Sequence, residues 1–186
     1  MDYSRFINDL KNTLEKFFET GSEKLDQVID LLCESLSSGQ KILIFGNGGS
    51  ASQSQHFAAE LINKFLKVRS PLPAISLATD TSALTSIAND FSFDLVFSKQ
   101  IEALGEKGDV AIGLSTSGNS PNIINAFESA RKKGLKTIAI TGNGGGKIAA
   151  VCDYLLDVPS DATPRIQEVH LLILHIVAEE IEKRCC

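Results

Sequence analysis

Ile42-Leu43-Ile44-Phe45-Gly46-Asn47-Gly48-Gly49-Ser50 is the stretch of sequence that decides the fold. Four consecutive apolar residues ended by glycines predict a strand that is buried on both faces, as in a parallel sheet. The turn at residues 46–50 leads into residues 53–63, which are predicted to form a helix. A strand, a glycine turn and a helix in succession form the first half of a βαβ unit.

The same alternation continues along the rest of the chain. Further short apolar runs lie at residues 74–77, 110–114, 137–140 and 154–158, separated by Gly-, Ser- or Asn-rich turns and amphipathic segments. Runs of this length that alternate with helices predict an α/β fold whose parallel sheet is covered by helices on both faces.

Helical segments flank this α/β core, which we place at residues 41–160 of a single domain spanning residues 1–186. Residues 1–38 carry apolar side chains at helical spacing on both sides of Gly21-Ser22, which predicts two helices with a break there. Residues 163–184 predict one long helix whose apolar residues cover more than one face. A chain of this size can hardly enclose such a helix, so we expect both flanking segments to take part in oligomer contacts.

Composition and charge exclude several classes of protein. Hydrophobic residues make up 43% of the chain and charged residues 22%, so a folded core is expected. The 18 Lys and Arg against 23 Asp and Glu give a formal charge of −5 without any basic block, which argues against nucleic-acid or membrane partners. Neither a signal peptide nor a membrane-spanning run is recognisable, and we therefore expect a soluble, cytoplasmic protein.

Four cysteines lie at Cys33, Cys152, Cys185 and Cys186. Their spacing matches neither a zinc ribbon nor a local redox pair, so the expectation is reduced thiols in an intracellular protein. No pattern in the sequence assigns a role to the two vicinal cysteines at the chain end.

Two turns have the composition of phosphate-binding loops. The first is residues 46–50, and the second is Ser115-Thr116-Ser117-Gly118-Asn119-Ser120, which follows the run at 110–114 and precedes a helix from Pro121. Each turn places glycines and hydroxyls at a helix N-terminus, where free N–H groups and the helix dipole favour an anion. One such turn could equally be a helix cap, but two at the strand ends of one parallel sheet favour phosphate binding.

Residues 46–51 also satisfy the dinucleotide fingerprint G-x-G-x-x-A. That alternative requires a ribose-binding acid about 20 residues further on, and the nearest acid at a strand end, Asp80, comes late. The Ser-rich second loop also suits a phosphomonoester better than a dinucleotide. A third glycine-rich turn, residues 141–146, is expected to be no more than a tight strand-to-helix connection.

His56 and Glu60 stand four residues apart on the helix that follows the first loop, so both side chains can reach one divalent ion. The other histidines, His170 and His175, lie on the last helix together with Gln167. A histidine among apolar residues is more often a hydrogen-bonded core residue than a ligand. Gln167 and His175 are separated by eight residues, or about 12 Å of helix rise, and if both bind one ion we expect different subunits to supply them.

In combination these motifs resemble the phosphoheptose isomerase family over about residues 3–184. The segments that carry the resemblance are residues 46–50, His56-x-x-x-Glu60, Asn89-Asp90, residues 115–120 and Arg165-Ile166-Gln167-Glu168-x-His170. The resemblance implies an α/β SIS (sugar isomerase) domain with a five-stranded parallel sheet, doubly wound like flavodoxin and Rossmann folds. It also implies a homotetramer with active sites at subunit interfaces, and conversion of D-sedoheptulose 7-phosphate to D-glycero-D-manno-heptose 7-phosphate for lipopolysaccharide or other glycoconjugates.

The resemblance further implies which residues form the site. One Zn²⁺ per subunit would be held by His56, Glu60, Gln167 and His175, and Glu60 and His175 would be the catalytic acid–base pair. The implied contacts to phosphate and sugar are Asn47, Gly48, Gly49, Ser50, Glu60, Asn89, Asp90, Ser115, Thr116, Ser117, Ser120 and Gln167.

These residue types suit an aldose–ketose isomerisation. The reaction moves a proton between C1 and C2 through a cis-enediolate, which needs a carboxylate at the carbon proton and a second acid–base group at the oxygens. We expect Glu60 to carry the carbon-bound proton, His175 to handle the oxygen protons and Zn²⁺ to act as Lewis acid. Whether Glu60 binds metal and acts as base at the same time stays open.

Other functional classes share this scaffold. Proteins that associate with the bacterial replication initiator resemble the family closely but generally lack the residues at Glu60 and His175, and the presence of both here favours the enzyme. An isomerase for another ketose phosphate is a further alternative, because the phosphate loops read only the end of the sugar. A DNA-binding regulator is disfavoured, since the first 40 residues are too short and too acidic for an added helix-turn-helix domain.

Overall fold

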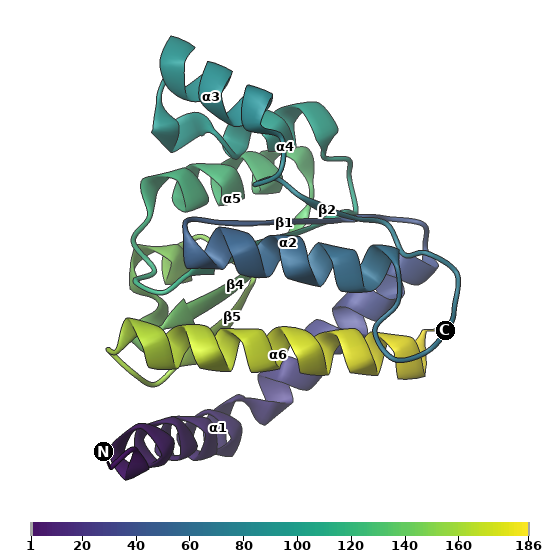
Figure 1. The fold of residues 1–186 in the computed structure, drawn as a ribbon. Coiled ribbons are helices and arrows are strands. Elements are labelled where there is room, and N and C mark those ends of the chain that lie inside the picture. Colours follow the sequence, from purple (N-terminus) through teal and green to yellow (C-terminus); the bar gives the residue numbers. More distant parts are fainter. Residues whose placement is uncertain (1, 186) are drawn as a thin grey trace.

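The computed structural model describes residues 2–185, which form one five-stranded parallel sheet with helices on both faces (Figure 1). The strands are β1 (Ile42–Gly46), β2 (Ala74–Ser76), β3 (Val110–Ser115), β4 (Lys136–Gly142) and β5 (Tyr154–Val158). The helices are α1 (Ser4–Ser37), α2 (Gly49–Ile62), α3 (Thr81–Asp90), α4 (Ser98–Leu104), α5 (Pro121–Lys133) and α6 (Thr163–Arg184), with 3-10 helices η1 (Phe93–Leu95) and η2 (Asn143–Ala150). The predicted fold class is confirmed, and each predicted apolar run forms a strand.

The order of the strands places a topological switch point near the middle of the sheet. The order is β2-β1-β3-β4-β5, so the chain moves from β1 to β2 on one side and then crosses to β3 on the other. β1 and β3 pair from Ile42↔Val110 to Gly46↔Leu114, which puts their carboxyl ends next to each other. In doubly wound sheets of this order, ligands bind at the crevice between these two strand ends.

Each face of the sheet has its own hydrophobic core. On one face, Ile44 and other strand residues pack with buried side chains of α1, α2 and α6. On the other face, Phe45 packs with Phe97, next to α4, and with Phe127 of α5. Because alternate residues of a strand point to opposite faces, the unbroken apolar run at 42–45 supplies both cores.

The N-terminal segment is one helix, α1, and the prediction of two helices with a break at Gly21-Ser22 is wrong. Gly21 is buried, and a Cβ added there would come within 3.2 Å of the Phe17 ring. The glycine therefore lets the Phe17 ring lie close to the helix. A glycine costs only about 1 kcal/mol in a helix interior, so packing of the surrounding side chains can outweigh it.

α6 lies along one face of the sheet together with α1 and α2 (Figure 1). Its apolar residues that are buried within the single chain are Ile166, Val169, Ile173, Leu174, Val177, Ala178 and Ile181. Leu171, Leu172 and Ile176 of the same helix are only partly buried, so the single chain does not enclose α6 fully, and the oligomer stays a prediction. Within residues 2–185, neither α6 nor any other helix is both long and apolar enough to cross a bilayer.

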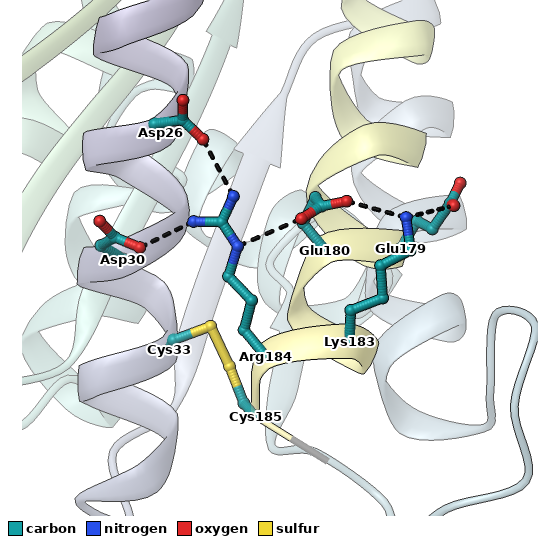
Figure 2. Close-up of polar contacts among 8 residues, drawn as sticks. All are labelled: Asp26, Asp30, Cys33, Glu179, Glu180, Lys183, Arg184 and Cys185. Atoms are coloured by element: carbon teal, nitrogen blue, oxygen red, sulfur yellow. Dashed lines mark hydrogen bonds and ion pairs between the residues drawn. A yellow bond between two sulfur atoms is a disulfide. The ribbon is translucent and has the colours of Figure 1, made fainter.

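Cys33 and Cys185 form a disulfide that joins α1 to the residue following α6 (Figure 2). The expectation of reduced thiols is wrong for this pair, whereas Cys152 is free and Cys186 lies outside the described residues. The two bonded cysteines are 152 residues apart in the chain, and the packing of α1 against α6 brings their Cα atoms to 5.6 Å. Patterns of local spacing do not detect such a pair.

Candidate active site

The two predicted phosphate loops lie side by side at the switch point of the sheet. The first loop follows β1 and the second follows β3, its neighbour. Asn47 of the first loop and Asn122, in the first turn of α5, exchange two amide hydrogen bonds of 3.0 and 2.8 Å. These bonds hold the loop before α2 against the first turn of α5. The N-termini of α2 and α5 therefore lie next to each other, where both can attract one anion.

Glycines allow the first loop to turn tightly from strand to helix. Gly48 has a φ of +52°, a left-handed conformation that residues with a Cβ rarely adopt. A Cβ at Gly46 would lie 2.7 Å from the Cβ of Ser50, so a larger residue would push the helix away from the strand. α2 then begins without a hydrogen bond from a capping side chain, which leaves its N-terminus suited to an external anion.

The hydroxyl groups of the second loop are not used to cap α5. Ser115 Oγ and Ser120 Oγ are 3.1 Å apart, and Ser120, the residue that precedes the helix, makes no capping bond through its side chain. Thr116 and Ser117 line a pocket of about 190 Å³. Its other lining residues are Asn143, Ser160, Asp161, Thr163 and Ile166. The two loops therefore favour the phosphate-binding interpretation over simple helix capping.

The third glycine turn supports the second loop, a role that we did not predict. Gly144, Gly145 and Gly146 all have positive φ and belong to η2. Gly118 approaches this turn so closely that a Cβ added to it would lie 2.1 Å from the Gly145 carbonyl oxygen. The N–H of Ile148 also donates to the Gly118 carbonyl at 2.9 Å. The run of three glycines was the available signal, because other residues rarely take left-handed conformations in succession.

His56, Glu60 and His175 converge where α2 and α6 run side by side. His56 Nε2 lies 2.8 Å from His175 Nε2 and 3.6 Å from Glu60 Oε1. Both helices follow strands of one parallel sheet and run in the same direction (Figure 1). The contact between the two rings shows that residue 56 of one helix is level with residue 175 of the other. A single chain thus brings together both predicted catalytic residues and three of the four predicted metal ligands.

The two facing histidine rings lie within hydrogen-bond distance of each other. A hydrogen bond between two ring nitrogens needs an N–H on one ring and a lone pair on the other. The side chain of His56 is 42% exposed and that of Glu60 is 22% exposed, so a small molecule can reach them. The ring of Phe65 lies beside His175 with its centroid 5.5 Å away. The group is therefore open at His56 and covered at His175.

The donor atoms of this group are the types that bind Zn²⁺. They are two imidazole nitrogens and a carboxylate. The two nitrogens lie closer together than two ligands of one tetrahedral zinc ion, which are about 3.3 Å apart at bonds of about 2.0–2.1 Å. In the part of the chain that the structure describes, no three His, Cys, Asp or Glu side chains are already arranged around one metal position. The residue types fit the ion, and a small separation of the two rings would admit it.

Gln167 lies at the first loop, at a different level of α6 from His175. A Cβ on Gly49 would come within 2.7 Å of Gln167 Nε2, and Gln53 Nε2 donates to the Gln167 carbonyl at 2.7 Å. α6 is continuous, so the eight residues between Gln167 and His175 correspond to about 12 Å of rise. This position suits a contact to the phosphate or to a sugar hydroxyl, and a role of Gln167 as metal ligand stays a prediction.

Asn89 and Asp90 stand apart from the rest of the predicted site within the single chain. They lie at the end of α3, where the Asn89 side-chain amide donates to Asp90 Oδ1 at 2.8 Å and both residues are exposed. α3 belongs to the face of the sheet opposite α2 and α6 (Figure 1). The structure therefore does not bring these two predicted substrate contacts together with His56 and His175.

Two residues that we considered as functional have structural roles. His170 is fully buried, and its Nε2 donates to the Thr141 carbonyl at 3.0 Å, as expected of a core histidine. Asp80, the candidate ribose-binding acid, accepts the N–H of Ala83 at 2.9 Å and caps α3. This use of Asp80 disfavours the dinucleotide alternative.

The fold and the paired loops correspond to a known class of protein. A family model described as the SIS domain matches residues 5–142, which cover β1 to β4 and both phosphate loops. The chain is therefore a SIS-domain protein.

Known relatives define the particular family. A phosphoheptose isomerase of Helicobacter pylori (strain P12) is 54% identical over 173 residues, which are 93% of this chain and 90% of the relative. The solved structure of a phosphoheptose isomerase from Neisseria gonorrhoeae is 44% identical and covers 97% of this chain and 96% of its own, with a TM-score of 0.91. One from Francisella tularensis has the same coverage and a TM-score of 0.94 at 34% identity. The chain belongs to the phosphoheptose isomerase family.

Proposed function

We propose that this protein is an aldose–ketose isomerase that converts D-sedoheptulose 7-phosphate to D-glycero-D-manno-heptose 7-phosphate. Relatives named phosphoheptose isomerase match over nearly the whole chain, which supports this reaction. The observation that carries the proposal is the convergence of His56, Glu60 and His175: His56 Nε2 lies 2.8 Å from His175 Nε2 and 3.6 Å from Glu60 Oε1. Since initiator-associating proteins generally lack two of these residues, the convergence favours the enzyme over that alternative.

In the proposed reaction the phosphate loops orient the substrate. The N-termini of α2 and α5, with the hydroxyls of the second loop, bind the phosphate, because helix N-termini favour anions. Fixing one end of the sugar directs the carbonyl end along α2 and α6 toward Glu60 and His175. Binding the sugar in this orientation lowers the barrier to proton transfer, because the reacting groups are already held next to each other.

Glu60 and His175 then divide the proton transfers. Glu60 takes the proton from C1 of the ketose, while His175 donates a proton to the carbonyl oxygen at C2, which gives the enediol. Glu60 returns its proton to C2, and His175 takes the proton from the hydroxyl at C1, which leaves the aldose. His56 Nε2 lies 2.8 Å from His175 Nε2, so a hydrogen bond between the two rings can orient His175.

We also propose that the site binds one Zn²⁺ through His56, Glu60 and His175 of one chain, with Gln167 of a neighbouring subunit as the fourth ligand. Two imidazoles and a carboxylate are ligand types that this ion prefers, which supports the assignment. When bound, the ion supplies Lewis-acid stabilisation of negative charge on the substrate oxygens. Metal analysis of the purified wild type is expected to find about one zinc per subunit. The zinc content of His56→Gln is expected to be lower, because one ligand is removed.

We further propose a cytoplasmic homotetramer whose product supplies heptose for lipopolysaccharide or other glycoconjugates. Asn89 and Asp90 lie on the other face of the sheet from Glu60, so a neighbouring subunit would have to supply them if they contact the substrate. Light scattering measures the assembly, and a monomer with full activity would contradict a site shared between subunits.

Incubation with D-sedoheptulose 7-phosphate, with and without Zn²⁺, tests the proposed function directly. NMR is expected to show conversion to the heptose 7-phosphate, and a panel of five- and six-carbon ketose phosphates is expected to react more slowly. Turnover confined to a shorter sugar would overturn the heptose assignment but keep the isomerase class.

The role of Glu60 is tested by Glu60→Gln, which keeps the shape of the side chain and removes the base. We expect kcat to fall at least about 100-fold, because proton transfer to a positioned group contributes about that much. Binding of the phosphate, measured by calorimetry, is expected to stay intact. Glu128→Gln, an exposed change on α5 on the other face of the sheet, is the control. Near-normal turnover of Glu60→Gln with phosphate bound would show that the assignment is wrong.

A further inference from the structure

The loop at residues 63–73, between α2 and β2, is held in place by a buried carboxylate. The side chain of Glu182, on α6, is only 1% exposed. It accepts the backbone N–H groups of Phe65, Leu66 and Lys67 at 2.7, 2.8 and 2.8 Å. A carboxylate that accepts several backbone N–H groups is well satisfied, and its bonds are strong because it is charged. Glu182 therefore fixes the conformation of this loop.

Arg69 connects the same carboxylate to the end of α2. Its Nε lies 3.2 Å from Glu182 Oε1, within ion-pair distance although the N–H is not aimed at the oxygen. Its Nη2 donates to the Glu60 carbonyl at 2.8 Å, and its Nη1 donates to the Leu61 carbonyl at 2.7 Å. These carbonyls belong to the last turn of α2, where helical N–H partners are missing. Arg69 thus fixes the backbone at Glu60.

Phe65 connects the carboxylate to His175. The ring of Phe65 lies against the His175 ring, with centroids 5.5 Å apart and planes inclined by 30°. His175 and Glu182 are seven residues, or about two turns, apart and therefore lie on the same side of α6. Glu182 thus binds the backbone of Phe65 while the ring of Phe65 covers His175. We refer to Glu182 and Arg69 together as the anchor.

The charge of the anchor persists through the neutral pH range. Burial alone would raise the pKa of Glu182, but the three backbone N–H groups and Arg69 outweigh it and hold the pKa below its usual value. The carboxylate is therefore ionised at every pH at which histidine acid–base chemistry operates.

We propose that Glu182 and Arg69 are positioning residues for the isomerisation, because they fix the backbone of Glu60 and the ring that covers His175. The inference rests on the proposed function, since it takes Glu60 and His175 as the catalytic pair. The anchor lies at the end of α2 remote from the phosphate loops. Its loss is therefore expected to lower kcat and to leave KM nearly unchanged.

Asp109 offers a matched control. Its side chain is 2% exposed, accepts the N–H groups of Lys41 and Glu106 at 3.0 and 2.8 Å, and lies 2.6 Å from Lys41 Nζ. Asp109 directly precedes β3, at the amino-terminal ends of the strands, whereas the phosphate loops lie at their carboxyl ends. Asp109→Asn therefore removes a carboxylate of similar burial and bonding that has no contact with the site.

The test compares kcat, KM and the urea midpoint of the wild type with those of Glu182→Gln, Asp109→Asn and Phe65→Leu. kcat and KM are measured under conditions in which all four proteins are folded. Glu182→Gln is expected to lower kcat about 10- to 100-fold with KM within about twofold of the wild type. Asp109→Asn is expected to lower the urea midpoint but not kcat. Phe65→Leu keeps the backbone N–H groups and removes only the ring, and we expect kcat to fall about tenfold.

Amide hydrogen exchange in the metal-free protein supplies a readout that does not depend on activity. Glu182→Gln is expected to speed exchange at residues 65–67, and Asp109→Asn is not. If Glu182→Gln and Asp109→Asn lose similar stability and both keep kcat, the anchor only stabilises the fold and the proposal is overturned. If Glu182→Gln does not fold, Phe65→Leu decides the question, and an unchanged kcat overturns the proposal.

Failure of the proposed function would be recognised separately. It is indicated when the wild type itself turns over no ketose phosphate. In that case, faster exchange at residues 65–67 together with a shifted NMR signal of the His175 ring in Glu182→Gln still supports positioning of His175. An unshifted ring signal overturns it.

Discussion

His170 is buried in the core and has one ring nitrogen bonded and the other free. Nε2 donates to the Thr141 carbonyl, whereas Nδ1 has no partner among residues 2–185. Burial lowers the pKa of His170 to about 4, although the hydrogen bond to Thr141 opposes this shift. Between the usual value of 6.5 and about 4, the unfolded chain therefore binds a proton that the folded chain does not. Stability should fall as the pH is lowered through this window.

We expect this one histidine to cost the wild type about 2–3 kcal/mol of unfolding free energy between about pH 7 and pH 4.5. In His170→Gln the amide can still donate to Thr141 but does not titrate, so the loss should be smaller. Urea unfolding at a series of pH values measures both. All other ionisable groups are the same in the two proteins, so equal pH dependence would contradict the account.

Gly118 is a position where the residue type is fixed by both conformation and space. Its φ is +64°, and an added Cβ would lie 2.1 Å from the Gly145 carbonyl oxygen. We expect Gly118→Ala to lower the free energy of unfolding by more than about 2 kcal/mol and to raise KM, because the second loop must move. Gly39→Ala is the control, since Gly39 has a φ of +81° and nothing within 4 Å of an added Cβ. Equal thermal midpoints for the two variants would rule out the role of the contact with Gly145.

At the scale of elements, the disulfide is the strongest link between the ends of α1 and α6. Arg184 also joins the helices, through ion pairs of 3.0 Å to Asp26 and 2.8 Å to Asp30 (Figure 2). These aspartates are 63% and 71% exposed, so water and salt screen the pairs and they add little stability. The covalent bond between Cys33 and Cys185 therefore matters most at this end.

We expect Cys33→Ser to lower the free energy of unfolding by about 2–4 kcal/mol, because the disulfide restricts the unfolded chain. Urea unfolding without reductant measures the change. Reductant should weaken the wild type to the same degree and leave Cys33→Ser unaffected. Cys152→Ser, at the free cysteine, should behave like the wild type in both conditions. Identical midpoints for the wild type and Cys33→Ser would mean that the bond does not stabilise the fold.

At the scale of the whole molecule, the sequence was most informative where structure depends on neighbouring residues. The predicted strands agree with the observed ones to within two residues at each end, because unbroken apolar runs mark strands covered on both faces. The helix break predicted at Gly21 was wrong, because a helix-breaking residue in the sequence does not show how the side chains around it pack. The Cys33–Cys185 bond could not be predicted, since its partners meet only after α1 packs against α6.

The candidate site shows the same limit. The spacing of His56 and Glu60 was readable because both lie on one helix, whereas the approach of His175 depends on how α2 and α6 align. Glu182 lies among Glu179, Glu180 and Lys183, a charged stretch typical of a solvated helix end. Only the folded chain shows that this one carboxylate is buried.

The parallel course of α2 and α6 has a consequence for which sugars can react. Gly49, at the phosphate end, and His56, at the catalytic end, are seven residues apart, or about 10.5 Å along the helix. A substrate held by its phosphate at the first level must be long enough for its carbonyl carbon to arrive at the second. On the proposed site, the rise along the helix between these two levels therefore limits which sugar lengths can react. On this account, a pentose phosphate held at the first level would end short of Glu60 and His175 unless both helices were shortened.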